Sequence, residues 1–440
     1  ALVAMGIPTM LGMMVNAIYN LVDAYFVGGL GTSQMGAISV VYPLGQVVVG
    51  LGLLFGNGAA SYLSRLLGNG DKEKADKVAS TALYSSITVG AIMIIFSVIF
   101  LQPILKLLGA TDSIMPYAIT YASIYIVSCI FNVFNVTMNN IVTSEGAAKT
   151  TMLALMAGAI LNIGLDPVFI YVLDMGVAGA AIATAISQIV STLVYLTFVL
   201  RKKSVYNFKI KNCTFTKEIM SEIFKIGIPT LVFQILTSLS ISLVNTQARP
   251  YGDSVIAGMG AVTRVVSMGS LMVFGFIKGF QPIAGYSYGA KKFDRLHEAI
   301  KTSIIWSTVF CVIYGLVLTV FSKGIISQFT KGDLEMIRVG TQSLRINGIS
   351  FILFGFYTVY SSLFLALGKG LAGFILGACR QGICFVPVIL ILPMFWGING
   401  ILYVQPIADV LSAIITIFMA LHLHQELDVT KQKFLSEKAG

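Results

Sequence analysis

Charged residues are scarce in this chain of 440 residues: Asp, Glu, Lys and Arg make up only 11%, whereas hydrophobic residues make up 56%. So few charges could not cover the surface of a water-soluble domain of this length. Apolar runs of 20 or more residues recur along the sequence, and about 20 residues span the hydrocarbon core of a membrane as a helix. The chain is therefore predicted to be an all-α, multi-pass protein of the cell (inner or plasma) membrane.

Histidine and cysteine are also sparse. The three histidines, His297, His422 and His424, lie near loops or the C-terminus, and the five cysteines show no metal-ligand spacing. No nucleophile–base pair or zinc motif is recognisable. These features predict a protein that is not an enzyme and holds no metal or cofactor, with the cysteines as free thiols.

The N-terminal residues carry no sign of a cleavable signal sequence, because the first apolar run contains polar residues and continues as a membrane span. Since the chain begins inside that run, a short cytoplasmic segment is expected to precede it.

The sequence repeats itself at a fixed interval. The motif GIPT occurs at residues 6–9 and again at 227–230, an offset of 227 − 6 = 221. The same offset relates four pairs of glycines: Gly58 and Gly279, Gly68 and Gly289, Gly176 and Gly397, and Gly179 and Gly400. Repeats of this length predict two equivalent bundles, and in transporters built from repeats the substrate site lies at the interface between them.

Twelve helical spans are predicted, six in each repeat. The first six lie near residues 1–28, 34–66, 75–101, 115–143, 150–173 and 177–200. The second six lie near residues 219–249, 254–287, 296–321, 335–366, 370–394 and 398–425. This predicts an N-terminal six-helix lobe at 1–200, a linker at 201–218, a C-terminal six-helix lobe at 219–425 and a tail at 426–440.

Lysine and arginine are distributed unequally between the two sides of the predicted spans. Eighteen, counting Arg380, lie in or beside loops that follow even-numbered spans, and five lie in loops that follow odd-numbered spans. The positive-inside rule then places both termini, the linker and the tail in the cytoplasm. The net charge of +10 is explained by basic loops facing anionic lipids, and it requires no nucleic acid. Because each repeat has six spans, the two lobes have the same orientation in the membrane.

Ionisable residues inside spans need an explanation, since each costs about 2.5–3.5 kcal/mol on insertion. The first repeat has Asp23 in span 1 and Asp166 in span 5. Both lie about 10 Å below the outer surface, as does Thr184 in span 6. Tyr19 and Asn162 precede the two aspartates by four residues each, so they share the same helix faces one turn deeper. If spans 1, 5 and 6 are neighbours, these five residues form one polar cluster.

Two carboxylates close together in a medium of low dielectric constant cannot both ionise, so the pair either holds a proton or has a cation between its members. Either arrangement would be an ion-coupling site. In the alternative, each aspartate only caps or hydrogen-bonds a broken helix. A polar face on span 4 either borders the same cavity or bonds neighbouring helices; it consists of Asn132, Asn135, Asn139 and Asn140.

The second repeat is chemically different. Its spans contain one carboxylate, Asp409, together with Arg264 and Lys278 in span 8 and Arg345 in span 10. Arg264, Arg345 and Asp409 lie at similar depths, so they are expected either to form ion pairs with one another or to contact the substrate.

Four stretches of the sequence, taken together, resemble the multidrug and toxic compound extrusion (MATE) transporters. They are GIPTMLGMMVNAIYNLVDAYFVGGLG at the start, LNIGLDPVFIY in span 5, GVAGAAIATAISQ in span 6 and GFQPIAGYSYGAKKFDR at the end of span 8. The resemblance extends over essentially the whole chain and is strongest to bacterial members of the DNA-damage-inducible branch. It implies two six-helix lobes around a central cavity, and exchange of drugs or other organic cations for H⁺ or Na⁺.

The resemblance also implies which residues bind the coupling ion. The first-lobe ion site of the family corresponds to Tyr19, Asp23, Asn162, Asp166 and Thr184, together with an asparagine of span 4 that is either Asn135 or Asn139. Another branch of the family uses acidic residues in spans 7 and 10. Span 7 of this chain offers only Gln234 and Asn245, as cavity candidates, which favours coupling through the first lobe.

The predicted function is multidrug efflux by antiport. A proton entering from outside would neutralise the aspartate pair, alter span 1 and release a bound cation outward. Pro8 lacks an amide hydrogen and therefore weakens span 1, which makes it a candidate hinge. The alternative is a flippase or exporter of anionic or lipid-linked substrates, whose cavity would be lined by Arg264, Lys278, Arg345 and Arg380. The expected partners are small organic cations and membrane lipids, and a monomer is expected because the repeat already supplies two lobes.

Overall fold

A computed structural model describes the chain except residues 109, 111, 329, 331 and 440. The side chains at positions 21, 24, 25, 28, 32, 35, 36, 39, 43, 242, 245, 249, 253, 256, 257, 260 and 439 also lie outside the description. All regular structure in the described part is helical. Eleven helices are long and apolar enough to cross a membrane, and a bent pair of helices supplies a twelfth span. The predicted all-α fold with twelve spans is thus confirmed.

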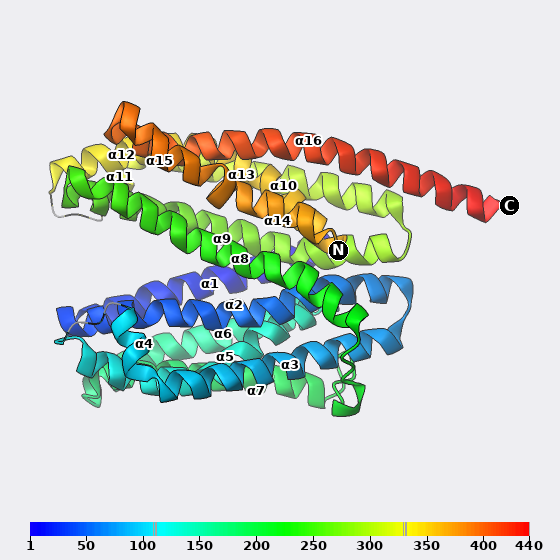
Figure 1. Ribbon diagram of the computed structural model, residues 1–440, viewed down its shortest axis with the longest axis horizontal. Coiled ribbons are helices and arrows are strands. Elements are labelled where there is room, and N and C mark those ends of the chain that lie inside the picture. The colour runs from blue at the N-terminus through cyan, green and yellow to red at the C-terminus, as the bar shows by residue number, and fades with distance from the viewer. Residues whose placement is uncertain (109, 111, 329, 331, 440) are drawn as a thin grey trace. The chain divides into compact units, whose positions relative to one another are not determined.

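The chain divides into two compact units, Val3–Leu231 and Val232–Gly440. In the first unit the long helices run side by side, and in Figure 1 they are coloured from blue to green. Its helices are α1 (Leu2–Gly28), α2 (Thr32–Asn69), α3 (Lys72–Ile99), α4 (Leu101–Leu107), α5 (Met115–Ser144), α6 (Ala148–Pro167), the π-helical turn η1 (Val168–Val172), α7 (Gly176–Leu200) and the 3₁₀ turn η2 (Ile210–Asn212).

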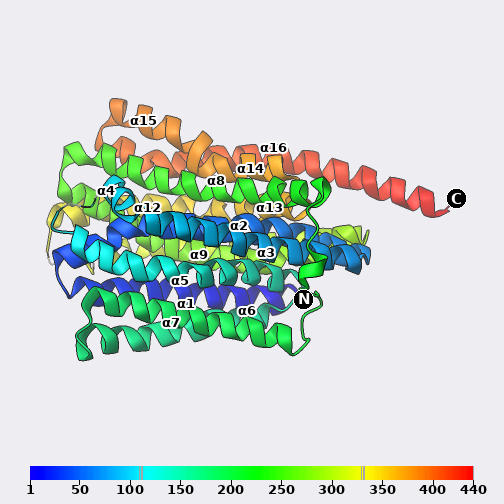
Figure 2. The same ribbon diagram turned by 60° about the horizontal axis from the view of Figure 1, so that its bottom comes forward.

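Helix α8 (Lys217–Ala248) continues from the first unit into the second. The second unit then contains η3 (Arg249–Tyr251), α9 (Asp253–Gly289), α10 (Phe293–Val320), α11 (Ser322–Ser327), α12 (Leu334–Ser350), α13 (Ile352–Ala366), α14 (Gly370–Ala378), the π-helical turn η4 (Cys379–Ile383), α15 (Phe385–Trp396) and α16 (Ile398–Ala439). In both views α15 lies along α16 (Figures 1 and 2).

The glycines that mark the repeat build the same joint in both units. Gly176 and Gly397 each adopt a positive φ of 59°, which favours glycine, at the start of the sixth and twelfth spans. Three residues later, a Cβ atom on Gly179 would lie 2.6 Å from the carbonyl oxygen of Phe169, and one on Gly400 would lie 2.6 Å from that of Leu392. The glycines therefore permit each of these spans to approach the backbone of the span before it.

The first half of α8 packs on the first unit, although the sequence placed it in the C-terminal lobe beginning at residue 219. Arg65 pairs with Glu222 at 2.9 Å between Nη2 and Oε2, and Asn57 Nδ2 donates to Thr230 Oγ1 at 2.9 Å. The boundary between the compact units falls after Leu231, two residues beyond Pro229, which interrupts the helical hydrogen bonds. The linker at 201–218 is thus followed by a helical segment, residues 219–231, that belongs to the first unit.

Helix α16 runs to Ala439, well past the predicted end of span 12 at residue 425. Leu427 is buried on this extension, one turn after the buried Leu423. Ion pairs hold the extension beside other parts of its own unit: Glu426 with Lys369 and Lys431 with Asp294, both at 2.6 Å. From residue 426 to Ala439 the predicted tail is therefore a continuation of the helix, which Figure 1 shows extending past the other helices of this unit.

Glu145, at the end of α5, ties the linker to the first unit. Its Oε2 accepts hydrogen bonds from Ser204 Oγ at 2.9 Å and from the amide of Val205 at 2.8 Å. Its other oxygen, Oε1, is buried and has no hydrogen-bond partner in the described part of the chain. Burial raises the pKa of Glu145 from 4.5 to about 7, and the hydrogen bonds from the linker oppose this shift only in part.

The raised pKa of Glu145 predicts how stability depends on pH. The folded protein binds the proton more tightly than the unfolded chain, so this contribution is complete below pH 4.5 and is lost as the pH rises through about 7. The difference of 7 − 4.5 units sets an upper limit of about 3 kcal/mol. We expect the apparent Tm of the purified protein to fall between pH 5 and pH 7.5, and the fall to be smaller in Glu145→Gln. An equal fall of the apparent Tm in the parent and in Glu145→Gln would show that other groups cause the fall.

Candidate ion-coupling site

Asp166 and Asp23 form the centre of the polar cluster in the first unit. Asp166 is fully buried at the end of α6, directly before Pro167 and the π-helical turn η1. Its carboxyl group lies close to that of Asp23 on α1. Ionised carboxylates have only acceptor atoms and repel each other, so this arrangement suits a proton shared by the pair or a cation between its members. The Oδ1 atom of each aspartate is buried without a hydrogen-bond partner among the described residues.

Asn162 connects this pair to helix α7. Its Nδ2 donates to Asp166 Oδ2 at 3.2 Å, and its Oδ1 accepts a hydrogen bond from Ser187 Oγ at 3.5 Å. Tyr19 lies close enough to both aspartates to interact with them electrostatically. Thr184 is buried on α7, three residues before Ser187 and therefore on the same helix face. The structure thus brings Tyr19, Asp23, Asn162 and Asp166 together.

The two candidate asparagines of span 4 both bond to α7. Asn135 Nδ2 donates to the carbonyl and the side-chain oxygens of Gln188, at 2.9 and 2.8 Å, and its Oδ1 accepts from Thr192 at 2.9 Å. Asn139 Nδ2 donates to Tyr195 OH at 3.1 Å. Along α7, Asn135 lies nearer to the carboxyl pair, because Gln188 follows Ser187. The choice between the two asparagines as an ion ligand stays open.

Sequence reasoning missed Ser187 and Gln188 as neighbours of the site. The repeat offset could have identified Gln188, because 188 + 221 = 409 and Asp409 is the carboxylate expected in the spans of the second repeat. Ser187 has no comparable signal, since buried serines are common in packed membrane helices.

The basic residues of the second unit are arranged differently from the expectation. Asp409 pairs with Arg380, at 2.8 Å between Oδ1 and Nε, and not with Arg264 or Arg345. Arg380 lies within span 11, so it is not one of the loop residues that bear on the positive-inside rule. Arg264 is exposed on α9, and the exposed Arg345 donates from Nε to Ser322 Oγ at 3.0 Å. The pairing predicted from depth was therefore wrong, because depth does not specify which helix faces meet.

The remaining candidates lie on different helices. Lys278 is half-buried on α9 and Gln234 is half-buried on α8, while the side chain of Asn245 lies outside the described residues. Pro8 lies inside α1, which is continuous from Leu2 to Gly28. The hydroxyl of Thr9 donates to the carbonyls of Met5 and Gly6 at 2.9 and 3.0 Å, next to the missing amide of the proline. The role of Pro8 as a hinge stays a prediction.

Comparison with protein families identifies the fold. The family model described as MatE matches residues 8–168 and 229–391. The chain belongs to the MatE family. The two matched segments begin 229 − 8 = 221 residues apart, which is the interval of the internal repeat. The predicted resemblance to bacterial MATE transporters is thereby confirmed, and the chain is a multi-pass membrane transporter.

Named relatives of this MatE protein are exporters. It is 31% identical to the multidrug export protein MepA of Staphylococcus saprophyticus, over 98% of this chain and 95% of that protein. It is also 31% identical to MepA of Staphylococcus aureus, over 99% of this chain and 96% of that protein.

Solved structures of MATE proteins have the same fold. One, described as an outward-facing conformation of a multidrug resistance MATE family transporter, has a TM-score of 0.92 at 26% identity, covering 97% of this chain and 96% of that one. A MATE protein in a bent conformation has a TM-score of 0.90 at 27% identity, covering 98% and 96%. A transporter from Pyrococcus furiosus, described as having a binding pocket of reversed polarity, has a TM-score of 0.91 at 26% identity, covering 97% and 96%.

Proposed function

We propose that this MATE transporter exports organic cations in exchange for H⁺ bound at Asp23 and Asp166. The observation that carries the proposal is the proximity of the two carboxyl groups, with Asp166 fully buried and Asp23 half-buried, because two acids this close disfavour each other's ionisation. A buried acid pair with no basic partner is costly in a membrane protein, and such residues mark ion pathways. The similarity to multidrug export proteins supports organic cations as the exported class.

The exchange follows from the charge of the pair. With one proton the pair carries one negative charge, which suits an accompanying cation; with a second proton it is neutral and no longer attracts a cation. Asn162 holds the Asp166 carboxyl group against α7, and Tyr19 lies beside both acids. Proton binding therefore changes how α1 is held against α6, which is how a local protonation becomes a change of conformation.

The orientation and assembly of the protein are part of the proposal. The excess of Lys and Arg in alternate loops supports cytoplasmic termini, and the two repeats within one chain support function as a monomer. Membrane lipids are the expected surroundings, and nucleic acid has no role.

The second candidate is export of anionic or lipid-linked substrates, because one similar solved structure is described as having a pocket of reversed polarity that suggests a different function. In this chain the buried arginine Arg380 is neutralised by Asp409. The acid pair of the first unit has no basic partner among the described residues, so the structure favours cations.

Ethidium efflux from proteoliposomes, driven separately by a pH gradient and by a Na⁺ gradient, tests the function. We expect efflux with the pH gradient and none with Na⁺ alone. Efflux driven by Na⁺ alone would contradict proton coupling, and absence of ethidium movement under both gradients would favour the anionic class.

A further inference from the structure

Three irregular membrane helices of the second unit meet at the Arg380–Asp409 ion pair. Span 10 is bent by 51° between α12 and α13, directly after Ser350. Arg380 lies in the π-helical turn η4 of span 11, and α16 contains Pro406 three residues before Asp409. Irregular backbone at membrane depth is tolerated only inside protein or beside a cavity, and π-helical turns occur frequently at functional sites.

Side chains compensate the carbonyl groups around the π-helical turn. Tyr357 OH donates to the carbonyl oxygen of Gly377 at 3.2 Å, and Ser240 Oγ donates to that of Gln381. The helix therefore keeps its extra residue without unpaired carbonyl groups at these two positions. The π-helical turn is thus stabilised by side chains of two other helices.

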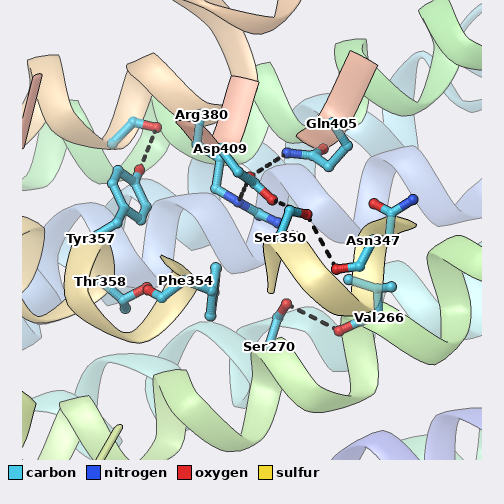
Figure 3. A network of polar contacts seen from close by, with 11 residues as sticks. Val266, Ser270, Asn347, Ser350, Phe354, Tyr357, Thr358, Arg380, Gln405 and Asp409 are labelled. Carbon is cyan, nitrogen blue, oxygen red and sulfur yellow. Dashed lines mark hydrogen bonds and ion pairs between the residues drawn. The ribbon is translucent and has the colours of Figure 1, made fainter. Parts of the chain in front are cut away.

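Asp409 receives hydrogen bonds from three spans. Arg380 Nε donates to its Oδ1 at 2.8 Å, Gln405 Nε2 donates to the same oxygen at 2.9 Å, and Ser350 Oγ donates to Oδ2 at 2.9 Å. Figure 3 shows these side chains converging on the carboxylate. The guanidinium group of Arg380 also lies over the ring of Phe354, 4.6 Å from its centre.

Few of the donors of this guanidinium group are used within the described chain. Within the described chain, the hydrogen bond found for Arg380 comes from Nε, although a guanidinium group has five N–H donors. Arg380 is only 8% exposed and Asp409 only 5% exposed. A carboxylate and an aromatic face on two sides of a planar cation are the elements by which proteins recognise organic cations. Arg380 thus occupies a setting that would suit such a ligand.

Stability alone does not explain this pair. Apolar residues of similar volume often stabilise a protein as well as a buried ion pair or better, because both charges must be desolvated. By the repeat offset, Arg380 corresponds to Ala159 (380 − 221) and Asp409 to Gln188 (409 − 221), so the equivalent positions of the first unit are uncharged. The fold therefore does not require the charges at this place.

We infer that Asp409 and Phe354 form a second cation site, which Arg380 fills in this structure and vacates for a planar, delocalised substrate cation such as an amidinium or guanidinium compound. The inference rests on the proposed export of organic cations. The π-helical turn provides a route for Arg380 to leave. If this turn changed to a regular α-helix, the extra residue would be absorbed and the side chain of Arg380 would rotate about the helix axis by about 100°.

Binding of benzamidinium to the purified protein, measured by isothermal titration calorimetry, tests the site. Arg380→Ala exposes Asp409 to the ligand, so we expect binding at least tenfold tighter than in the parent. The double variant Arg380→Ala, Asp409→Asn removes the acid, so the gain should disappear. Unchanged affinity in Arg380→Ala, or a gain that persists in the double variant, would overturn the inference.

A second variant covers the case in which Arg380→Ala does not fold. Arg380→Lys keeps the charge beside Asp409 but loses the planar group that stacks on Phe354. We expect it to fold and to bind benzamidinium at least threefold more tightly than the parent, because lysine competes less well for the site. Affinity equal to that of the parent in this folded variant would contradict the inference.

Efflux separates this inference from the proposed function. If the parent shows proton-driven ethidium efflux but benzamidinium affinity does not respond to Arg380, only the second site is wrong. If affinity responds to Arg380 as expected but the parent shows no gradient-driven efflux, the cation site stands and the proposed coupling fails.

Discussion

Asp166→Asn is expected to reduce proton-driven ethidium efflux to the level of protein-free vesicles. The substitution preserves the shape of the side chain and its contact with Asn162, but it removes one of the two groups that share a proton. Asp23→Asn should have the same effect, because without a second acid beside it the remaining carboxyl group stays ionised and does not bind the coupling proton. The measurement is efflux from proteoliposomes under an imposed pH gradient, at equal amounts of folded protein.

Asp174→Asn provides a matched control for this prediction. Asp174 is exposed in the turn after η1, with a φ of 52° that asparagine also tolerates. We expect the parent rate from this variant. Near-parent efflux in both Asp23→Asn and Asp166→Asn would remove the pair from the mechanism.

The same substitutions should not weaken the fold. Asp23 and Asp166 each have a buried oxygen without a hydrogen-bond partner in the described chain, and two acids in contact oppose each other's ionisation. An asparagine at either position relieves that cost, so the apparent Tm should stay equal or rise. A loss of transport with retained Tm is the signature of a site that trades stability for function.

Valine at Gly179 or Gly400 is expected to destabilise the fold strongly. The new side chain would meet the backbone carbonyl of Phe169 or Leu392, 2.6 Å from the Cβ position, and backbone in a packed helix cannot move aside as a flexible side chain can. We expect each variant to lose about 3 kcal/mol or more of stability, at or above the upper end of the usual cost of overpacking. Thermal unfolding followed by size-exclusion chromatography measures this loss.

Gly164→Ala is the control for the glycine variants. Gly164 is exposed on α6, and a Cβ there would meet no atom within 4 Å. Alanine should leave the Tm unchanged or raise it, since it favours a helix over glycine by about 0.8–1 kcal/mol. If Gly179→Val and Gly400→Val unfold at the parent temperature, the close backbone approaches at these two glycines do not contribute to stability.

Most of the fold could be predicted from hydropathy and the repeat, because a membrane span requires a long apolar run whatever its neighbours are. Asp23, Asp166, Tyr19 and Asn162 could be selected because ionisable and polar groups are conspicuous in such runs, and a spacing of four residues puts them on one helix face. The structure places them together, while their role in ion coupling stays a proposal.

Other features depend on packing that no local pattern specifies. The bend of span 10 falls at Phe351, where no proline marks a break, and the nearby Gly348 and Gly355 are two of 43 glycines in the chain. The π-helical turn at Arg380 is supported by Tyr357 and Ser240 from distant parts of the sequence. The partner of Asp409 depends on which faces of spans 11 and 12 meet, so depth alone led to the wrong arginine.

Proton release on ligand binding tests the central claim most directly. Purified protein in weakly buffered detergent is mixed with ethidium while a pH indicator records released protons, for the parent, Asp23→Asn and Asp166→Asn. If the acid pair exchanges its proton for the cation, the parent releases protons in proportion to bound ethidium and both variants release none. Release that persists in both variants, or ethidium binding to the parent without release, would contradict the account.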